Sequence, residues 1–157
     1  MKFSYQLILF LIVNFGALAI GSWLMGGESQ GEWYKSLNKA PWTPPGWVFG
    51  AAWTIVMITF SIFMAKTTEG KAIWNVNSAL IGLFWAQWIL NIAWNYIFFN
   101  QKWVGFGLAE ITVLFAAILI ITYLGARSHG LTALWALPYL IWLMIAISLN
   151  GYIMLRN

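Results

Sequence analysis

The sequence contains no cysteine and little charge, and each shortage excludes classes of protein. Without cysteine, its 157 residues cannot form disulfides, thiol active sites or cysteine metal sites. Only 8% of the residues are charged, too few to cover a soluble globule. The net charge of +4 is scattered, with no basic run that would bind nucleic acid. These shortages exclude most soluble classes and leave a membrane protein.

Most catalytic constellations are missing as well. The only histidine, His129, lies in a charged turn, where we expect it to be solvated. There is no helical pair of histidines, no pair of carboxylates inside an apolar segment and no phosphate-binding loop. No apolar segment carries a histidine that could serve as an axial haem ligand. We therefore predict no metal site and no obligatory cofactor.

Long apolar segments dominate what is present. The chain is 62% hydrophobic, and five apolar segments are separated by charged turns. Each segment is long enough to cross about 30 Å of hydrocarbon as a helix. We predict an all-α integral membrane protein with a single domain, 1–157, built as a bundle of five transmembrane helices. The approximate spans are 3–25, 44–65, 73–99, 103–126 and 131–155.

Two features of this arrangement stay open. Lys2 and the Ala17-Leu18-Ala19 sequence also suit a signal peptide, although the apolar run continues beyond that cleavage site. The positive-inside rule gives no orientation, because four Lys or Arg residues fall on each predicted side. Ala17 and Gly21 form a small-xxx-small pair that would let a neighbouring helix approach closely.

The long polar connection at residues 26–43 leads into a proline-rich entry to the second span. Ser29 and Glu32 fit a capping box before a short helix, whose Trp33, Tyr34 and Leu37 would share one side. This helix is either a lid over a cavity or an interfacial helix resting on lipid headgroups. The next helix is expected to begin with Thr43 as N-cap and Pro44 in its first position, and its Phe49, Trp53, Met57 and Phe60 share one face.

Polar groups inside the spans indicate an inward-facing surface. Asn91 and Asn95 share a face of the third span, and buried amides in lipid need partners. Glu110 is the one carboxylate inside a span, and it has either a functional role or a structural, hydrogen-bonded one. The last span is expected to be kinked at Pro138. One stripe of that span contains Trp135, Tyr139, Trp142, Ala146 and Asn150.

The aromatic content suits a binding pocket. The chain contains 12 tryptophans, more than two interfacial belts would need. Flat indole and phenol surfaces from three spans, together with a few amides, are typical of a pocket for a large, flat, mostly apolar ligand. The alternative is that the indoles only pack the helices and anchor the protein at the membrane interfaces. Both interpretations stay open on spacing alone.

Three motifs follow one another along the chain. They are Trp42-Thr-Pro44-Pro45-Gly-Trp47 followed by Trp53, then Leu90-Asn91-x-x-Trp94-x-x-x-Phe98-Phe99, and then Pro138-Tyr139-Leu-x-Trp142 with Leu149-Asn150. In this order and spacing they resemble the tryptophan-rich sensory protein family, the bacterial branch of the translocator protein (peripheral benzodiazepine receptor) family. The resemblance covers essentially the whole chain.

The resemblance implies a five-helix bundle in a bacterial cell membrane, commonly a homodimer, with a cavity under the first long loop. It implies that the ligands are porphyrins, such as protoporphyrin IX or a haem-like tetrapyrrole, and synthetic benzodiazepine-type or isoquinoline compounds. Some members are associated with light-dependent degradation of protoporphyrin, which would give Trp53 and Trp142 a photochemical role. By motif position, and with Tyr139 from the aromatic stripe, the pocket would contain Tyr34, Pro44, Trp53, Asn91, Trp94, Tyr139, Trp142 and Ala146.

Two further expectations come with the family. Leu149, Tyr152 and Arg156 fit its loose sterol-recognition pattern, although Tyr152 and Arg156 equally suit interfacial anchoring. The alternative function is transport of porphyrins or other amphiphiles, including sterol-like lipids, across the membrane. Against transport stand the absence of internal repeats and the scarcity of charge inside the spans.

Overall fold

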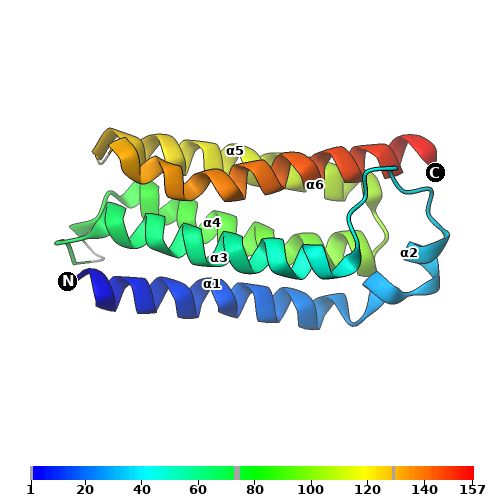
Figure 1. Ribbon diagram of the computed structural model, residues 1–157, viewed down its shortest axis with the longest axis horizontal. Helices are drawn as coiled ribbons and strands as arrows, with labels where there is room; N and C mark the ends of the chain where they lie inside the picture. Colours follow the sequence, from blue (N-terminus) through cyan, green and yellow to red (C-terminus); the bar gives the residue numbers. More distant parts are fainter. Residues whose placement is uncertain (1, 73–74, 129) are drawn as a thin grey trace.

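Long helices lie side by side along the longest axis of the molecule, with the two termini at opposite ends (Figure 1). The computed structural model describes residues 2–72, 75–128 and 130–157. The helices are α1 (Phe3–Met25), α2 (Glu32–Ser36), α3 (Gly46–Thr68), α4 (Ser78–Asn95), α5 (Val104–Ser128) and α6 (Leu137–Arg156), and the described ranges contain no strand. Short turns are the 3₁₀ segments η1 (Glu28–Gln30) and η4 (Gly130–Ala136) and the π-helical η3 (Tyr96–Asn100).

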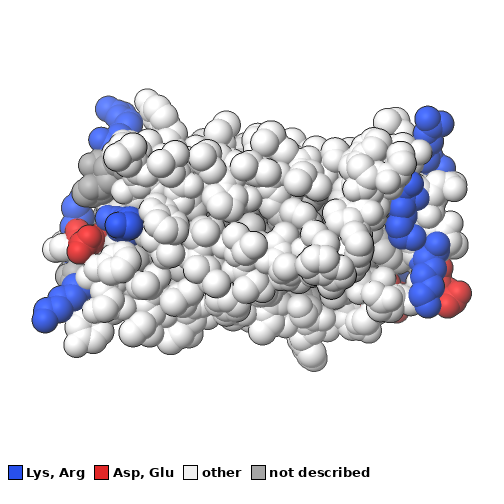
Figure 2. Space-filling view, in the orientation of Figure 1, with Lys and Arg blue, Asp and Glu red and all other residues white. Residues whose placement is uncertain are grey.

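Among the described residues, four stretches are long and apolar enough to cross a membrane: α1, α3, α5 and η4 with α6. Figure 2 shows the charged side chains gathered at the two ends of the molecule, with an uncharged band between them. The chain is therefore an integral membrane protein. The remaining long helix, α4, packs against α1 and α5 and carries three side-chain amides, Gln87, Asn91 and Asn95. A membrane crossing by α4 stays a prediction.

Two helices begin later than the sequence suggested. The N-cap of α3 is Pro45 rather than Thr43, so Pro44 lies outside the helix. The third span was expected from residue 73, but α4 begins at Ser78 because the Asn77 side chain caps it, accepting a hydrogen bond from the Ala79 backbone N–H at 2.9 Å. Residues 73 and 74, and the predicted solvated position of His129, lie outside the described residues.

The last span is not a single kinked helix. Gly130–Ala136 forms the 3₁₀ turn η4, and Pro138 lies in the first turn of α6. A proline is tolerated there because the first backbone N–H groups of a helix have no partner within it, so the predicted kink is wrong. Trp135 therefore lies before α6 and does not belong to the stripe of Tyr139, Trp142, Ala146 and Asn150.

The connection between α1 and α3 folds back over one end of the bundle (Figure 1). The predicted capping box is wrong, because Ser29 lies within η1, and Gly31 precedes α2 without any side-chain cap. The predicted side of α2 is confirmed: Trp33, Tyr34 and Leu37 pack against a buried cluster formed by Phe98, Phe99 and Ile153. Edge-to-face contacts join Trp33 to Phe98 at 5.7 Å and Tyr34 to Phe99 at 5.3 Å between ring centroids.

Helix α1 is bound into the bundle by buried amides. The Gln6 side chain donates to the backbone oxygen of Thr68 at 2.6 Å, and the Asn14 side chain donates to Ser61 Oγ at 2.8 Å. Farther along, a Cβ atom added to Gly21 would lie 2.7 Å from Asn95 Nδ2. The small-xxx-small pair thus permits the expected close approach, here between α1 and α4. The helix continues without a break through residues 17–19, the site of the alternative signal-peptide interpretation.

Candidate functional site

A cavity of about 470 Å³ lies under the α1–α3 connection, within the size range of small-molecule sites. Its walls come from α1, the connection, α3, α4 with η3, and α6. The lining residues are Leu18, Ser22, Met25, Ser29, Gln30, Tyr34, Lys35, Lys39, Thr43, Pro44, Gly46, Phe49, Gly50, Trp53, Asn91, Trp94, Asn95, Phe98, Phe99, Ala146, Leu149, Asn150 and Ile153.

Aromatic rings from three elements form flat walls in this cavity. Phe49 and Trp53, one turn apart on α3, lie opposite the end of α4 and the following η3. There, Trp94 stacks on Phe98 with ring centroids 4.9 Å apart and an interplanar angle of 12°. The π-helical turn places Phe98 and Phe99 next to each other, with ring centroids 5.0 Å apart. Such surfaces suit a large planar ligand better than a flexible aliphatic one.

Tyr139 lies behind the cavity rather than in its lining. Its side chain is fully buried, and its hydroxyl accepts a hydrogen bond from Asn91 Nδ2 at 2.8 Å and donates one to Gln87 Oε1 at 3.1 Å. Its ring makes an edge contact with Trp53 at 5.9 Å. Tyr139 therefore holds Asn91 and supports Trp53, both of which line the cavity.

Trp142 also lies one layer behind the lining. Its ring centroid is 5.4 Å from that of Phe49 and 6.5 Å from that of Trp53, in edge geometry with both. The indole is 6% exposed, and its Nε1 has no hydrogen-bond acceptor. Of the two indoles predicted to act photochemically, only Trp53 faces the cavity, with Trp142 as its neighbour.

Several buried polar atoms near the cavity have no hydrogen-bond partner among the described residues. Asn150 is 2% exposed, and neither its Nδ2 nor its Oδ1 makes a hydrogen bond. Trp94 Nε1, a donor only, is also unpaired. Asn150 fits closely because α5 has a glycine opposite it: a Cβ atom on Gly107 would lie 3.3 Å from Asn150 Nδ2. Buried polar groups usually have partners, so these atoms lack one that most such groups have, but each is closed off from solvent and does not face the open volume of the cavity.

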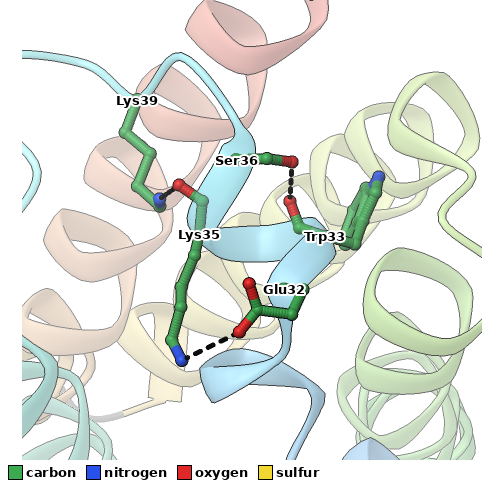
Figure 3. Close-up of polar contacts among 5 residues, drawn as sticks. All are labelled: Glu32, Trp33, Lys35, Ser36 and Lys39. Carbon is green, nitrogen blue, oxygen red and sulfur yellow. Dashed lines mark hydrogen bonds and ion pairs between the residues drawn. The ribbon is translucent and has the colours of Figure 1, made fainter.

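The α1–α3 connection contributes two lysines to the lining, Lys35 and Lys39, and Figure 3 shows both. Lys39 Nζ donates to the backbone oxygen of Lys35 at 3.3 Å and lies 4.7 Å from the centroid of the Tyr34 ring. Lys35 Nζ pairs with Glu32 Oε1 at 3.5 Å. Burial raises the pKa of Tyr34 above its ordinary value, so its hydroxyl stays neutral at physiological pH.

A structural role for Glu110 on α5 would require its carboxylate to be hydrogen-bonded, and the described part of the chain shows no such bond. Both carboxylate oxygens are buried, and neither finds a partner among the described residues. Glu110 does not line the cavity. Within the described residues, no group of His, Asp or Glu side chains could hold a metal ion.

The structure brings six of the eight predicted ligand-binding residues together in the lining: Tyr34, Pro44, Trp53, Asn91, Trp94 and Ala146. Tyr139 and Trp142 lie behind them. The lining also contains residues that the prediction missed, notably Leu18 and Ser22 of α1 and the two lysines of the connection. Sequence spacing gave no reason to assign α1 to the site, because its apolar residues are spread around the whole helix.

The residues of the sterol-like pattern are separated in space. Leu149 lines the cavity, whereas Tyr152 packs edge-on against Trp42 at 5.5 Å between ring centroids. The exposed Arg156 lies over the Tyr152 ring, with its guanidinium carbon 5.6 Å from the ring centroid. This arrangement suits interfacial anchoring by Tyr152 and Arg156.

Comparisons with known proteins agree on one family. The model of the TspO/MBR family matches residues 8–156. The chain is 36% identical over 131 residues to the tryptophan-rich protein TspO of Archaeoglobus fulgidus, covering 83% of each chain. It is 36% identical over 124 residues to protein CrtK of Rhodobacter capsulatus, covering 78% of this chain and 76% of the relative. Identity to the translocator protein of Homo sapiens is 30% over 138 residues, covering 83% and 78% of the two chains.

Proposed function

Because the chain belongs to the TspO/MBR family, we propose that its cavity binds a tetrapyrrole, such as protoporphyrin IX, within the membrane. One observation carries the proposal: flat aromatic surfaces of Trp53, Trp94 and Phe49 border a cavity of about 470 Å³. A planar macrocycle offers two faces for stacking, and its ring nitrogens and substituents offer hydrogen-bonding partners.

The α1–α3 connection acts in this proposal as a lid over a five-helix transmembrane bundle. Its residues Tyr34, Lys39 and Pro44 line the cavity, while Trp33 and Leu37 hold it on the cluster of Phe98 and Phe99. A lid of this kind keeps water from a flat apolar ligand and controls how quickly the ligand leaves.

Light-dependent degradation of the ligand is the second part of the proposal. A photoexcited porphyrin can take an electron from an oxidisable indole in contact with it and pass that electron to dissolved dioxygen, whose reduced form would then oxidise the macrocycle. Trp53 is the indole on the α3 wall, and Trp142 is the next indole behind it, at 6.5 Å between ring centroids. Trp53 would be the first electron donor, Trp142 would return an electron to the oxidised Trp53, and an external reductant such as a thiol would restore Trp142.

A protoporphyrin titration tests the binding proposal. We expect saturable binding at micromolar ligand, followed in the porphyrin absorption band, with loss of affinity in Trp53→Phe. The matched control is Trp85→Phe, because Trp85 is 48% exposed on α4 and does not line the cavity. Absence of saturable binding by the wild type would contradict the proposal. Flux of porphyrin into sealed vesicles, dependent on the same residues, would instead favour transport.

Illumination of the bound complex tests the photochemical part. Under conditions that saturate both variants with ligand, Trp53→Phe should abolish porphyrin loss, whereas Trp142→Phe should slow it, because only the second layer is removed. Loss of bound porphyrin at the wild-type rate in both variants would show that the indoles take no part in the reaction.

A further inference from the structure

The α1–α3 connection brings positive charge to the cavity. Among the described residues that line the cavity, the only charged side chains are Lys35 and Lys39, and both belong to this connection. The rest of the lining is uncharged. An uncharged ligand gains nothing from two cations in the lining, whereas an anionic ligand would be attracted to them.

Lys39 is the better placed of the two lysines. One of its three N–H donors is used by the backbone oxygen of Lys35, and the Tyr34 ring, itself part of the lining, lies beneath the ammonium group. The described residues provide no carboxylate partner for Lys39, because the ion pair in this region joins Lys35 to Glu32. Lys39 thus has donors available and is held at the cavity.

Lys35 contributes less. Its side chain is 58% exposed, and Glu32 already balances its charge at 3.5 Å. Exposed ion pairs of this kind are screened by solvent and are weak. Lys35 adds to the local positive potential, but a direct contact with the ligand is expected mainly from Lys39.

The lining also offers polar groups away from the lysines. Ser22 of α1 and the amides Asn91 and Asn95 of α4 line the cavity as well. Stacking surfaces and polar side chains therefore share one cavity with two lysines. The matching ligand is a flat molecule that carries acidic groups on its periphery.

We propose that the site selects tetrapyrroles that carry ionised carboxylates, with Lys39 forming an ion pair to an acidic side chain of the ligand. This inference rests on the proposed function and specifies the class of its ligand. Porphyrins whose acidic side chains are esterified keep the ring but lose this ion pair, so they bind less tightly.

The test compares protoporphyrin IX with its dimethyl ester on the purified full-length protein in detergent. The wild type is expected to prefer the acid by about fivefold, near the upper end for a partly exposed ion pair. Lys39→Gln should bring the ratio of the two affinities close to one, and Lys39→Arg should retain the preference. The two porphyrins partition differently into detergent, but this difference is the same for every variant. It therefore cancels when the acid-to-ester affinity ratio of one variant is compared with that of another.

Lys102→Gln is the matched control. Lys102 lies at the same end of the molecule, 5.8 Å from the centroid of the Trp33 ring, but does not line the cavity. Its replacement removes the same charge and should leave the preference unchanged. Equal changes in Lys39→Gln and Lys102→Gln would overturn the inference in favour of a general surface potential.

Other outcomes separate this inference from the proposed function. If the wild type binds acid and ester equally, or if Lys39→Gln keeps the preference for the acid, carboxylate selection is overturned while tetrapyrrole binding stands. If neither porphyrin binds saturably, the proposed function is overturned and the inference with it.

Discussion

At the scale of single residues, Tyr139 is the most constrained side chain near the site. It is fully buried on α6, and its hydroxyl joins Asn91 and Gln87, both on α4. Its ring contacts Trp53 and Phe60 of α3. One phenol thus links three helices behind the cavity wall.

Replacing Tyr139 with Phe should destabilise the protein without filling or emptying the cavity. The change leaves Asn91 Nδ2 and Gln87 Oε1 without their hydroxyl partner, which costs about 1–2 kcal/mol for buried groups in a membrane protein. The midpoint of thermal unfolding in detergent should therefore fall. The control is Tyr123→Phe, because Tyr123 is 61% exposed on α5. Equal midpoints for the two variants would contradict the structural role of the Tyr139 hydroxyl.

The sequence predicted which residues surround the cavity better than it predicted which of them line it and which lie one layer behind. Helical spacing placed Asn91 and Asn95 on one face of α4, and Phe49 and Trp53 on one face of α3, and all four line the cavity. Spacing could not distinguish the first layer from the second on α6. Tyr139 and Trp142 lie behind Trp53, whereas Ala146 and Asn150 of the same stripe reach the lining. Depth depends on how far α6 leans toward α3, and the sequence of one helix does not contain that information.

At the scale of elements, the α1–α3 connection decides what covers the cavity. Pro44 lines the cavity, and Pro45 caps α3 with φ −56° and ψ 149°. Both prolines restrict the backbone at the point where the connection meets the helix. The lid would thus be held over the ligand by the stiffness of this junction.

Replacing Pro44 and Pro45 together with Ala should weaken ligand binding. Each change frees backbone conformations that closing the lid must then restrict, at about 0.4–1 kcal/mol per residue. We expect faster dissociation of protoporphyrin, measured by stopped-flow displacement, and little loss of protein inserted in the membrane. Pro138→Ala, in the first turn of α6, is the control. Unchanged dissociation in the double variant would contradict the lid.

Helix α5 packs against α3 at a glycine. A Cβ atom on Gly125 would collide with the ring of Phe63, which is itself fully buried. Gly125→Ala should therefore destabilise the bundle by about 1–3 kcal/mol through overpacking. Gly82→Ala on α4 is the control, because no atom lies within 4 Å of its added Cβ. The control should be neutral or stabilising, since alanine favours helix over glycine. The measurement is the midpoint of thermal unfolding for both variants and the wild type. A midpoint of Gly125→Ala equal to that of the wild type would contradict the close packing at this glycine.

The element boundaries show where local sequence signals compete. Thr43 looked like a helix cap, but the two prolines that follow keep the chain extended until Gly46. Pro138 looked like a kink within one long helix, yet the preceding residues adopt a 3₁₀ turn, so the proline begins α6 instead. In both cases the prolines do lie near a helix start, as prolines often do. The predicted start of the helix relative to the proline was wrong.

At the scale of the whole molecule, the apolar band and the charged ends establish a membrane protein, and the family agrees with the motifs. Composition was sufficient for this conclusion, because so few charges cannot cover a soluble protein. The homodimer stays a prediction, since a single chain contains no partner to contact. The membrane orientation also stays open, because the two predicted sides carry equal numbers of basic residues.

The central claim is that the cavity under the α1–α3 connection holds the tetrapyrrole, and filling that cavity tests it most directly. Ala146 lines the cavity from α6, so Ala146→Phe should occupy the space of the ligand. Ala116→Phe, on an exposed position of α5, adds the same ring outside the cavity. We predict that protoporphyrin titration shows lost or strongly weakened binding for Ala146→Phe and wild-type binding for Ala116→Phe, with both proteins folded. Wild-type affinity in Ala146→Phe would contradict the claim.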